Sequence, residues 1–126
     1  MTSRRERILV VDDDVEFQRS LSKILRKAGY DVRCASESAQ AGRLIAQQFF
    51  PLVLLDIHLP GRSGLELLDD IRTKWPRAKV IVVTVNGDSS NYVRALEAGA
   101  FAFLTKPVKM KQVLQYSQLA LKTARN

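Results

Sequence analysis

Four short apolar runs, separated by segments with helical spacing, constrain the fold of this chain more than any other feature of its sequence. Each run holds four residues, mostly branched or aromatic, with polar or turn residues on either side: residues 8–11, 52–55, 80–83 and 101–104. Runs of this kind are typical of strands that are buried on both faces of a sheet. A fifth segment, residues 31–35, alternates apolar and polar side chains, which predicts an edge strand with one face in water.

Between these runs the apolar residues recur at the spacing of a helix. The stripe over residues 17–28 predicts the first helix, which Asp14 can cap and Gly29 can end. Further helices are expected at about residues 37–48, 67–75, 89–98 and 109–122. The strict alternation of strands and helices predicts an α/β fold of the flavodoxin-like (βα)5 type. This fold is a doubly wound, parallel, five-stranded sheet with the strand order 2-1-3-4-5.

The composition is that of one folded domain. The chain has 126 residues, of which 46% are hydrophobic and 26% charged, so we expect a single domain over 1–126 with its core at about 7–122. No apolar run approaches the roughly 20 residues of a membrane helix. Cys34 is the only cysteine, which excludes an intrachain disulfide, and with His58 it leaves too few ligands for a structural zinc site. We therefore expect a cytoplasmic protein without membrane contact.

The net charge of +7 comes from 20 basic and 13 acidic residues. A basic excess is a feature of many nucleic-acid-binding proteins. Here the basic residues are scattered and no run of five or more like charges occurs. We interpret the excess as a solvated basic surface that favours an acidic partner, and we expect no direct nucleic-acid binding by this domain.

Polar and charged residues that could take part in binding or catalysis follow the predicted strands. The carboxyl ends of parallel strands meet at one edge of a sheet, so these residues should lie together. They are Asp12, Asp13, Asp14, Asp56, Thr84 and Lys106. Crowded carboxylates repel one another, and a hard divalent cation with oxygen ligands, such as Mg²⁺, relieves that repulsion. We interpret Asp14 as the helix cap rather than as part of the cluster.

The order and separation of these residues resemble the receiver domain of bacterial two-component response regulators. The matching segments are residues 8–14, 56–64, 82–84 and 99–107, and the resemblance extends from Ile8 to about Leu121. It implies a phosphorylation-activated signalling module that is not a turnover enzyme. Such a module catalyses only its own phosphorylation and slow autodephosphorylation.

The resemblance also implies a role for each residue of the phosphorylation site. Asp56 would accept the phosphoryl group, and Lys106 would pair with a phosphoryl oxygen. Asp13 and Asp56 would bind Mg²⁺ directly, while Asp12 would help through water. His58 would offer its backbone carbonyl to the metal, with its side chain exposed in a loop.

Two residues are implied as the switch. Thr84 would move to hydrogen-bond the phosphoryl group, and Phe103 would then swing inward and change the surface of the fourth helix, fifth strand and fifth helix. We expect Phe101 and Phe103 to share one face of the last strand. The bond before Pro107 is expected to be cis, as in the Lys-Pro step of the family.

The implied partners follow from the same resemblance. A sensor histidine kinase or a phosphotransfer protein would supply the phosphoryl group, and an output domain or a downstream protein would respond to it. Phosphorylation could also drive formation of a homodimer. The sequence does not identify the kinase, the pathway or the output.

Other interpretations of the same residues stay open. An Asp-nucleophile phosphatase would need a second Asp two residues after the nucleophile, where this chain has His58. A receiver that has lost phosphorylation could serve only as a docking platform. Val85 departs from the family pattern, because a smaller residue is usual there, and we expect it to narrow access to Asp56, with His58 and Asn86 at the rim.

Overall fold

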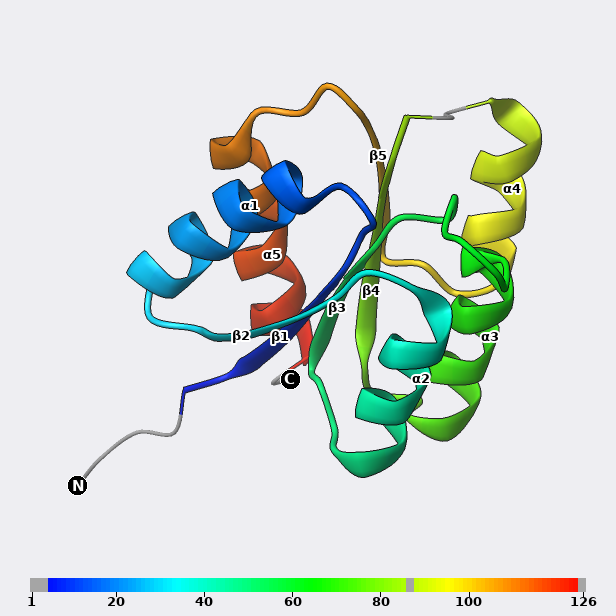
Figure 1. Ribbon diagram of the computed structural model, residues 1–126, viewed down its shortest axis with the longest axis horizontal. Helices are drawn as coiled ribbons and strands as arrows, with labels where there is room; N and C mark the ends of the chain where they lie inside the picture. Colours follow the sequence, from blue (N-terminus) through cyan, green and yellow to red (C-terminus); the bar gives the residue numbers. More distant parts are fainter. Residues whose placement is uncertain (1–4, 86–87, 125–126) are drawn as a thin grey trace.

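The computed structural model describes residues 5–85 and 88–124, which form five strands and five helices in strict alternation (Figure 1). In chain order these are β1 (Arg7–Val11), α1 (Val15–Lys27), β2 (Asp31–Ala35), α2 (Ser38–Gln47), β3 (Leu52–Leu55), α3 (Gly64–Lys74), β4 (Lys79–Thr84), α4 (Ser89–Glu97), β5 (Ala102–Thr105) and α5 (Met110–Ala124). Each predicted element is present, and most boundaries lie within a few residues of the predicted ones.

The five strands form one parallel sheet in the order β2-β1-β3-β4-β5, which confirms the predicted flavodoxin-like topology. Helices α1 and α5 cover one face of the sheet, and α2, α3 and α4 cover the other (Figure 1). Strands β1 and β3 end in register, with Val11 beside Leu55, and β4 and β5 end in register with each other, with Thr84 beside Thr105. The loops that follow them therefore start at the same edge.

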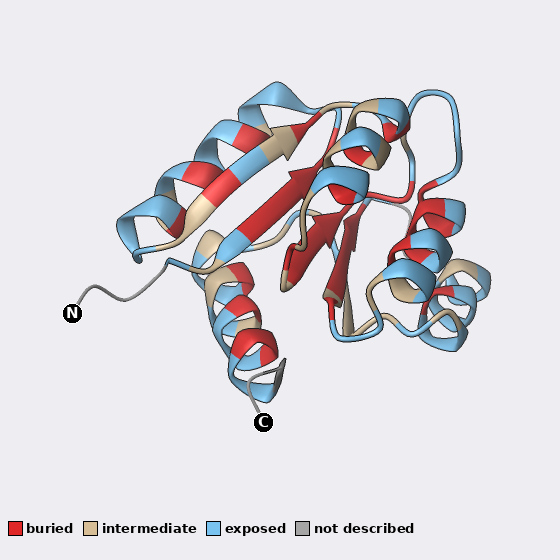
Figure 2. Cartoon of the chain, turned by 90° about the horizontal axis from the view of Figure 1, so that it is seen from below, coloured by how far each residue is buried: buried red, intermediate tan, exposed pale blue. Residues whose placement is uncertain are grey.

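Two apolar clusters, one on each face of the sheet, make up the core. Successive side chains of a strand point to opposite faces, so Ile8 and Val10 pack toward α1 and α5, whereas Leu9 and Val11 pack toward α2 and α3. The central strands are buried along almost their whole length (Figure 2). The edge strand β2 has a mixed burial pattern, as its alternating sequence predicts.

One prediction about the last strand is wrong. Phe103 packs with the cluster beneath α2–α4, but Phe101 packs with the cluster beneath α1 and α5. The two rings do not share a face because β5 begins only at Ala102, so strand alternation does not extend to Phe101. Phe101 is instead fixed by its backbone N–H, which donates to Val80 O at 2.7 Å.

Side-chain caps mark the start of helices α1 and α3, and the cap of α1 is the predicted one. The Asp14 side chain accepts a hydrogen bond from Phe17 N at 3.1 Å and so caps α1, and Gly29 follows that helix with a φ of +102°. At α3 the cap is Ser63, whose hydroxyl accepts from Leu65 N at 3.2 Å. The caps fix where α1 and α3 begin, and both helices begin just after loops that carry aspartates.

Gly64, the first residue of α3, fits against the chain that follows β3. A Cβ atom there would overlap Ile57 Cα and lie 2.7 Å from Asp56 O, both of which are backbone atoms that cannot rotate away. We expect Gly64→Ala to lower the free energy of unfolding by about 1–3 kcal/mol. Gly42, inside α2, is the matched control, because a Cβ there meets nothing within 4 Å.

Gly42→Ala should raise stability by about 0.5–1 kcal/mol through its better helix propensity. Urea unfolding of the two variants measures the difference. Equal effects of the two substitutions would contradict the close approach at Gly64.

Candidate functional site

The carboxyl edge of the sheet gathers the residues that the sequence singles out. Asp12 follows β1, Asp56 follows β3, Thr84 is the last residue of β4, and Lys106 follows β5. Backbone hydrogen bonds continue the sheet beyond the strand ends, with Asp56 N donating to Val11 O at 2.9 Å and Lys106 N to Thr84 O at 2.8 Å. The backbone of the sheet therefore sets the relative positions of these side chains.

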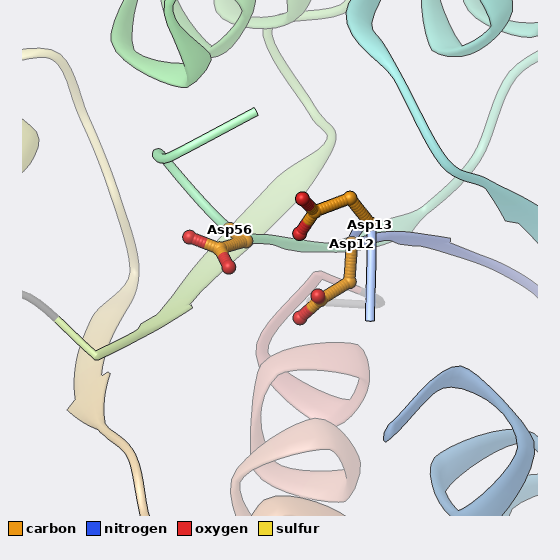
Figure 3. Close-up of side chains that lie close together, drawn as sticks. All are labelled: Asp12, Asp13 and Asp56. Carbon is orange, nitrogen blue, oxygen red and sulfur yellow. The ribbon is translucent and has the colours of Figure 1, made fainter. Parts of the chain in front are cut away.

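Three carboxylates meet at this edge. Oxygens of Asp12, Asp13 and Asp56 all lie within 4.8 Å of one another, and Figure 3 shows the three side chains close together. Asp12 and Asp56 are only 2% and 5% exposed, whereas Asp13 is exposed to solvent. Hard carboxylate oxygens in such a group, with one open side where waters can complete the coordination, fit the preferences of Mg²⁺.

The ammonium group of Lys106 reaches into the carboxylate cluster from β5. Its Nζ donates to Asp12 Oδ2 at 2.7 Å and lies 3.5 Å from Asp56 Oδ2. The same atom lies 4.2 Å from the centre of the Phe17 ring of α1, a distance at which a cation is attracted to an aromatic face. Lys106 is thus held between two carboxylates and an aromatic ring.

Burial and charge shift the protonation equilibria of this pair. Burial raises the pKa of Asp12 above its ordinary value, and hydrogen bonds from Lys106 and from Asp14 N oppose that rise without cancelling it. Burial alone would lower the pKa of Lys106, but the hydrogen bond to Asp12 and the charges of Asp12 and Asp56 together raise it. Lys106 is therefore a permanent cation at neutral pH.

The carboxylate of Asp56 is oriented from two sides. Its Oδ1 accepts a hydrogen bond from His58 N at 2.9 Å, and its Oδ2 faces Lys106. The turn that holds His58 N leaves the His58 side chain exposed, as predicted. Thr84 is fully buried and is the last residue of β4, the strand that pairs with β3.

Phe103 lies on the β5 strand beside β4, with its Cα paired to that of Val82. It is partly buried, and its ring makes an edge-to-face contact with Tyr92 of α4, with ring centres 5.5 Å apart and planes at 82°. Phe103 thus links the strand pair that ends at Thr84 to the exposed helix α4.

The structure also tests smaller expectations. The Lys106–Pro107 bond is cis, as predicted. Val85, directly after β4, is 67% exposed, and its effect on access to Asp56 stays a prediction. Asn86, expected at the rim of the site, lies outside the described residues.

Two residues of α1 that contact the site were not predicted to do so. Phe17 belongs to the apolar stripe and gave no sign of a contact with Lys106. Gln18 donates from its side chain to Asp12 O. A signal did exist for Gln18, because it lies three and seven residues before the buried Leu21 and Leu25, on a helix face where a polar side chain needs a partner.

Residues 8–118 match the family described as the response regulator receiver domain, and the chain belongs to this family. Its members are signalling modules of two-component systems that act through phosphorylation. The fold described above is that of a receiver domain, as the solved structures below show.

Among individual relatives, the chain is 36% identical over 118 residues to the response regulator protein PilR of Pseudomonas aeruginosa. It is 39% identical over 115 residues to the transcriptional regulatory protein KdpE of Mycobacterium tuberculosis. These alignments cover 94% and 91% of this chain but only 26% and 50% of the relatives. The chain thus spans half or less of the length of these relatives.

Solved structures agree closely with the fold. A CheY-like receiver domain protein from Methanospirillum hungatei has a TM-score of 0.94 at 36% identity, covering 97% of this chain and 98% of that one. A response regulator from Burkholderia pseudomallei, solved with a phosphorylated aspartic acid, a calcium ion and citrate, has a TM-score of 0.84 at 29% identity. That match covers 95% of this chain and 71% of the other.

Within the described ranges, no helix combines the length and apolar character needed to cross a membrane.

Replacing Lys106 by Met should lower the free energy of unfolding, because Asp12 and Asp56 would lose the cation beside them. We expect a loss of roughly 2–4 kcal/mol. This is less than the loss expected for a fully buried pair, because Lys106 is partly exposed to water. Urea unfolding at neutral pH measures this loss, and Lys109→Met, at an exposed lysine of the same loop, is the control.

A second substitution, Asp12→Asn, should restore part of the stability in the Lys106→Met background, since it removes one uncompensated charge. Equal stability of the Lys106→Met and Lys109→Met proteins would contradict the importance of the pair.

Proposed function

We propose that this chain is a phosphorylation-driven switch that accepts a phosphoryl group on Asp56 from a sensor histidine kinase or a phosphotransfer protein. The observation that carries the proposal is the position of the Asp56 carboxylate, which lies 3.5 Å from Lys106 Nζ and within 4.8 Å of carboxylate oxygens of Asp12 and Asp13. A nucleophile, a cation and a set of metal ligands thus lie within one small site. Membership of the receiver family supports the same activity.

The chemistry of the transfer suits these residues. An oxygen of Asp56 forms a bond to phosphorus as the bond between phosphorus and the leaving atom of the donor breaks, and the donor keeps that electron pair. Transfer depends mainly on positioning and on neutralising the charge of the phosphoryl oxygens. Lys106 would turn from Asp12 toward one of these oxygens, which its flexible side chain and its fixed positive charge allow.

The acidic cluster would hold one Mg²⁺. We assign Asp13 and Asp56 as direct ligands, Asp12 as a partner through water, and the backbone carbonyl of His58 as a further ligand. When bound, Mg²⁺ supplies positive charge beside the phosphoryl oxygens and relieves the repulsion among the carboxylates. The hydrogen bond from His58 N to Asp56 supports this set, because it fixes the turn from which that carbonyl would have to reach the metal.

Thr84 and Phe103 would transmit the conformational change from the phosphorylation site to the surface. The Thr84 hydroxyl would move to hydrogen-bond the phosphoryl group, and Phe103 would move into the space this opens. The contact between Phe103 and Tyr92 supports this route, because a Phe103 ring that moves inward either breaks its contact with Tyr92 or moves α4 with it. The altered surface would consist of α4, β5 and α5.

The partners follow from this switch. The chain would act as one receiver unit that controls an output domain or a downstream protein, as the greater length of the relatives suggests. Phosphorylation could also bring two copies together through the altered surface. Its catalysis would be limited to its own phosphorylation and to slow loss of the phosphoryl group.

Phosphorylation with a small phosphodonor and Mg²⁺ should add one phosphoryl group to the wild-type chain and none to Asp56→Asn. The added group should be lost in both acid and base, as expected of an acyl phosphate. Intact-mass spectrometry measures the labelling. Asp70→Asn, at an exposed aspartate of α3, is the control and should label normally.

Equal labelling of the wild type and Asp56→Asn would overturn Asp56 as the acceptor. Absence of labelling in the wild type would favour a receiver that serves only as a docking platform. Continuous turnover of the phosphodonor without a lasting acyl phosphate would favour the phosphatase interpretation.

Beryllofluoride, which mimics the phosphoryl group, should change amide chemical shifts well beyond the Asp56 loop. The largest changes are expected over residues 89–104, which include α4 and most of β5, because Phe103 connects these elements to Thr84. Thr84→Ala should keep the changes near Asp56 and lose those in α4. Changes confined to the Asp56 loop in the wild type would mean that the site binds the mimic without switching.

A further inference from the structure

The side chain of Gln18 joins three segments of the chain behind the acidic loop. It lies on α1, only 9% exposed, and its Nε2 donates to Asp12 O, to Ala35 O at 3.1 Å and to Ser36 Oγ at 3.1 Å. Two of these partners are backbone carbonyls, which can only accept hydrogen bonds. The amide nitrogen, rather than the amide oxygen, must therefore face the loop.

These contacts complete a closed link between the ends of β1 and β2. Asp12 N already donates to Ala35 O at 3.0 Å, so the N–H of Asp12 is tied to the end of β2 directly. Gln18 ties the carbonyl of Asp12 to the same Ala35 O. Both polar groups of the Asp12 backbone are thereby fixed to one point of the neighbouring strand.

Fixing the Asp12 carbonyl has a direct effect on Asp13. This carbonyl belongs to the peptide group that connects Asp12 to Asp13, and a peptide group is planar. Its orientation therefore sets the direction in which the chain continues to Asp13. The side chain of Asp13 is exposed, so the backbone has the main part in directing its carboxylate toward Asp56.

We propose that Gln18 is a positioning residue of the acidic site, which holds the Asp12–Asp13 peptide so that the Asp13 carboxylate stays within reach of a divalent cation shared with Asp56. This inference rests on the proposed function in one respect, namely that the cluster binds Mg²⁺. Gln18 would contact neither the metal nor the phosphoryl group. Its effect is on metal affinity, through the conformation of the loop.

The test compares Mg²⁺ binding by the wild type, Gln18→Met and Ser22→Ala, with MgCl2 titrated against amide chemical shifts. Met has nearly the shape of Gln but no donor, and we expect it to weaken Mg²⁺ binding roughly tenfold, as is usual when a residue that orients a metal ligand is lost. Ser22 is the matched control, because it is buried one turn further along α1 and its hydroxyl contacts Cys34 instead of the loop. Ser22→Ala should bind Mg²⁺ as the wild type does.

The outcomes separate this inference from the proposed function. Wild-type binding that is lost in Asp13→Asn establishes the metal site independently of Gln18. If the wild type binds Mg²⁺ and Gln18→Met binds it equally well, the role of Gln18 is overturned while the metal site stands. If the wild type does not bind Mg²⁺, both are overturned.

A measurement on the wild type alone covers the case in which Gln18→Met does not fold. The side-chain amide signals of Gln18 should shift with the same Mg²⁺ dependence as the backbone amide of Asp13. Those of Gln115, exposed on α5, should not shift. Gln18 signals that stay unchanged through the titration would overturn the proposal.

Discussion

The hydrogen-bonded ion pair between Lys106 and Asp12 is the interaction on which the rest of the site depends. It joins residues 94 positions apart in the sequence and brings the loop after β5 against the loop after β1. A partly buried pair of this kind adds little net stability, because removing both charges from water offsets most of their attraction. Its effect is geometric: it holds a cation beside carboxylates that would otherwise repel one another, 3.5 Å from the carboxylate of Asp56.

Helix α1 has a larger part in this site than its position in the core suggests. Its cap, Asp14, fixes where the helix starts, and the next turn places Phe17 against Lys106 and Gln18 against the Asp12 carbonyl. The two partners of the ion pair are therefore supported by consecutive residues of one helix. The buried face of that helix packs on β1, β2 and α5, which holds the helix in place beside the site.

The fold was predictable because hydrophobic spacing and strict alternation leave few topologies for a parallel sheet. The same topology brought Asp12, Asp56, Thr84 and Lys106 to one edge. Two kinds of feature could not be predicted from the sequence. One is the residue at which a strand begins, and the other is a contact between a side chain and a different helix or strand. The predicted face of Phe101 was wrong because β5 begins at Ala102, one residue later than predicted. The contacts of Gln18 were missed because its acceptors at Ala35 and Ser36 come near it only in the folded chain.

The arrangement of the core bears on how the site can lose its structure. Each central strand sends alternate side chains into both apolar clusters, so neither layer of helices can detach without exposing the strands that the other layer also covers. Partial melting of one face is therefore costly, and the two layers should unfold together as one cooperative unit. The backbone N–H groups of Asp12 and Asp56 are hydrogen-bonded into that unit, so their protons should exchange with solvent mainly when the whole domain opens.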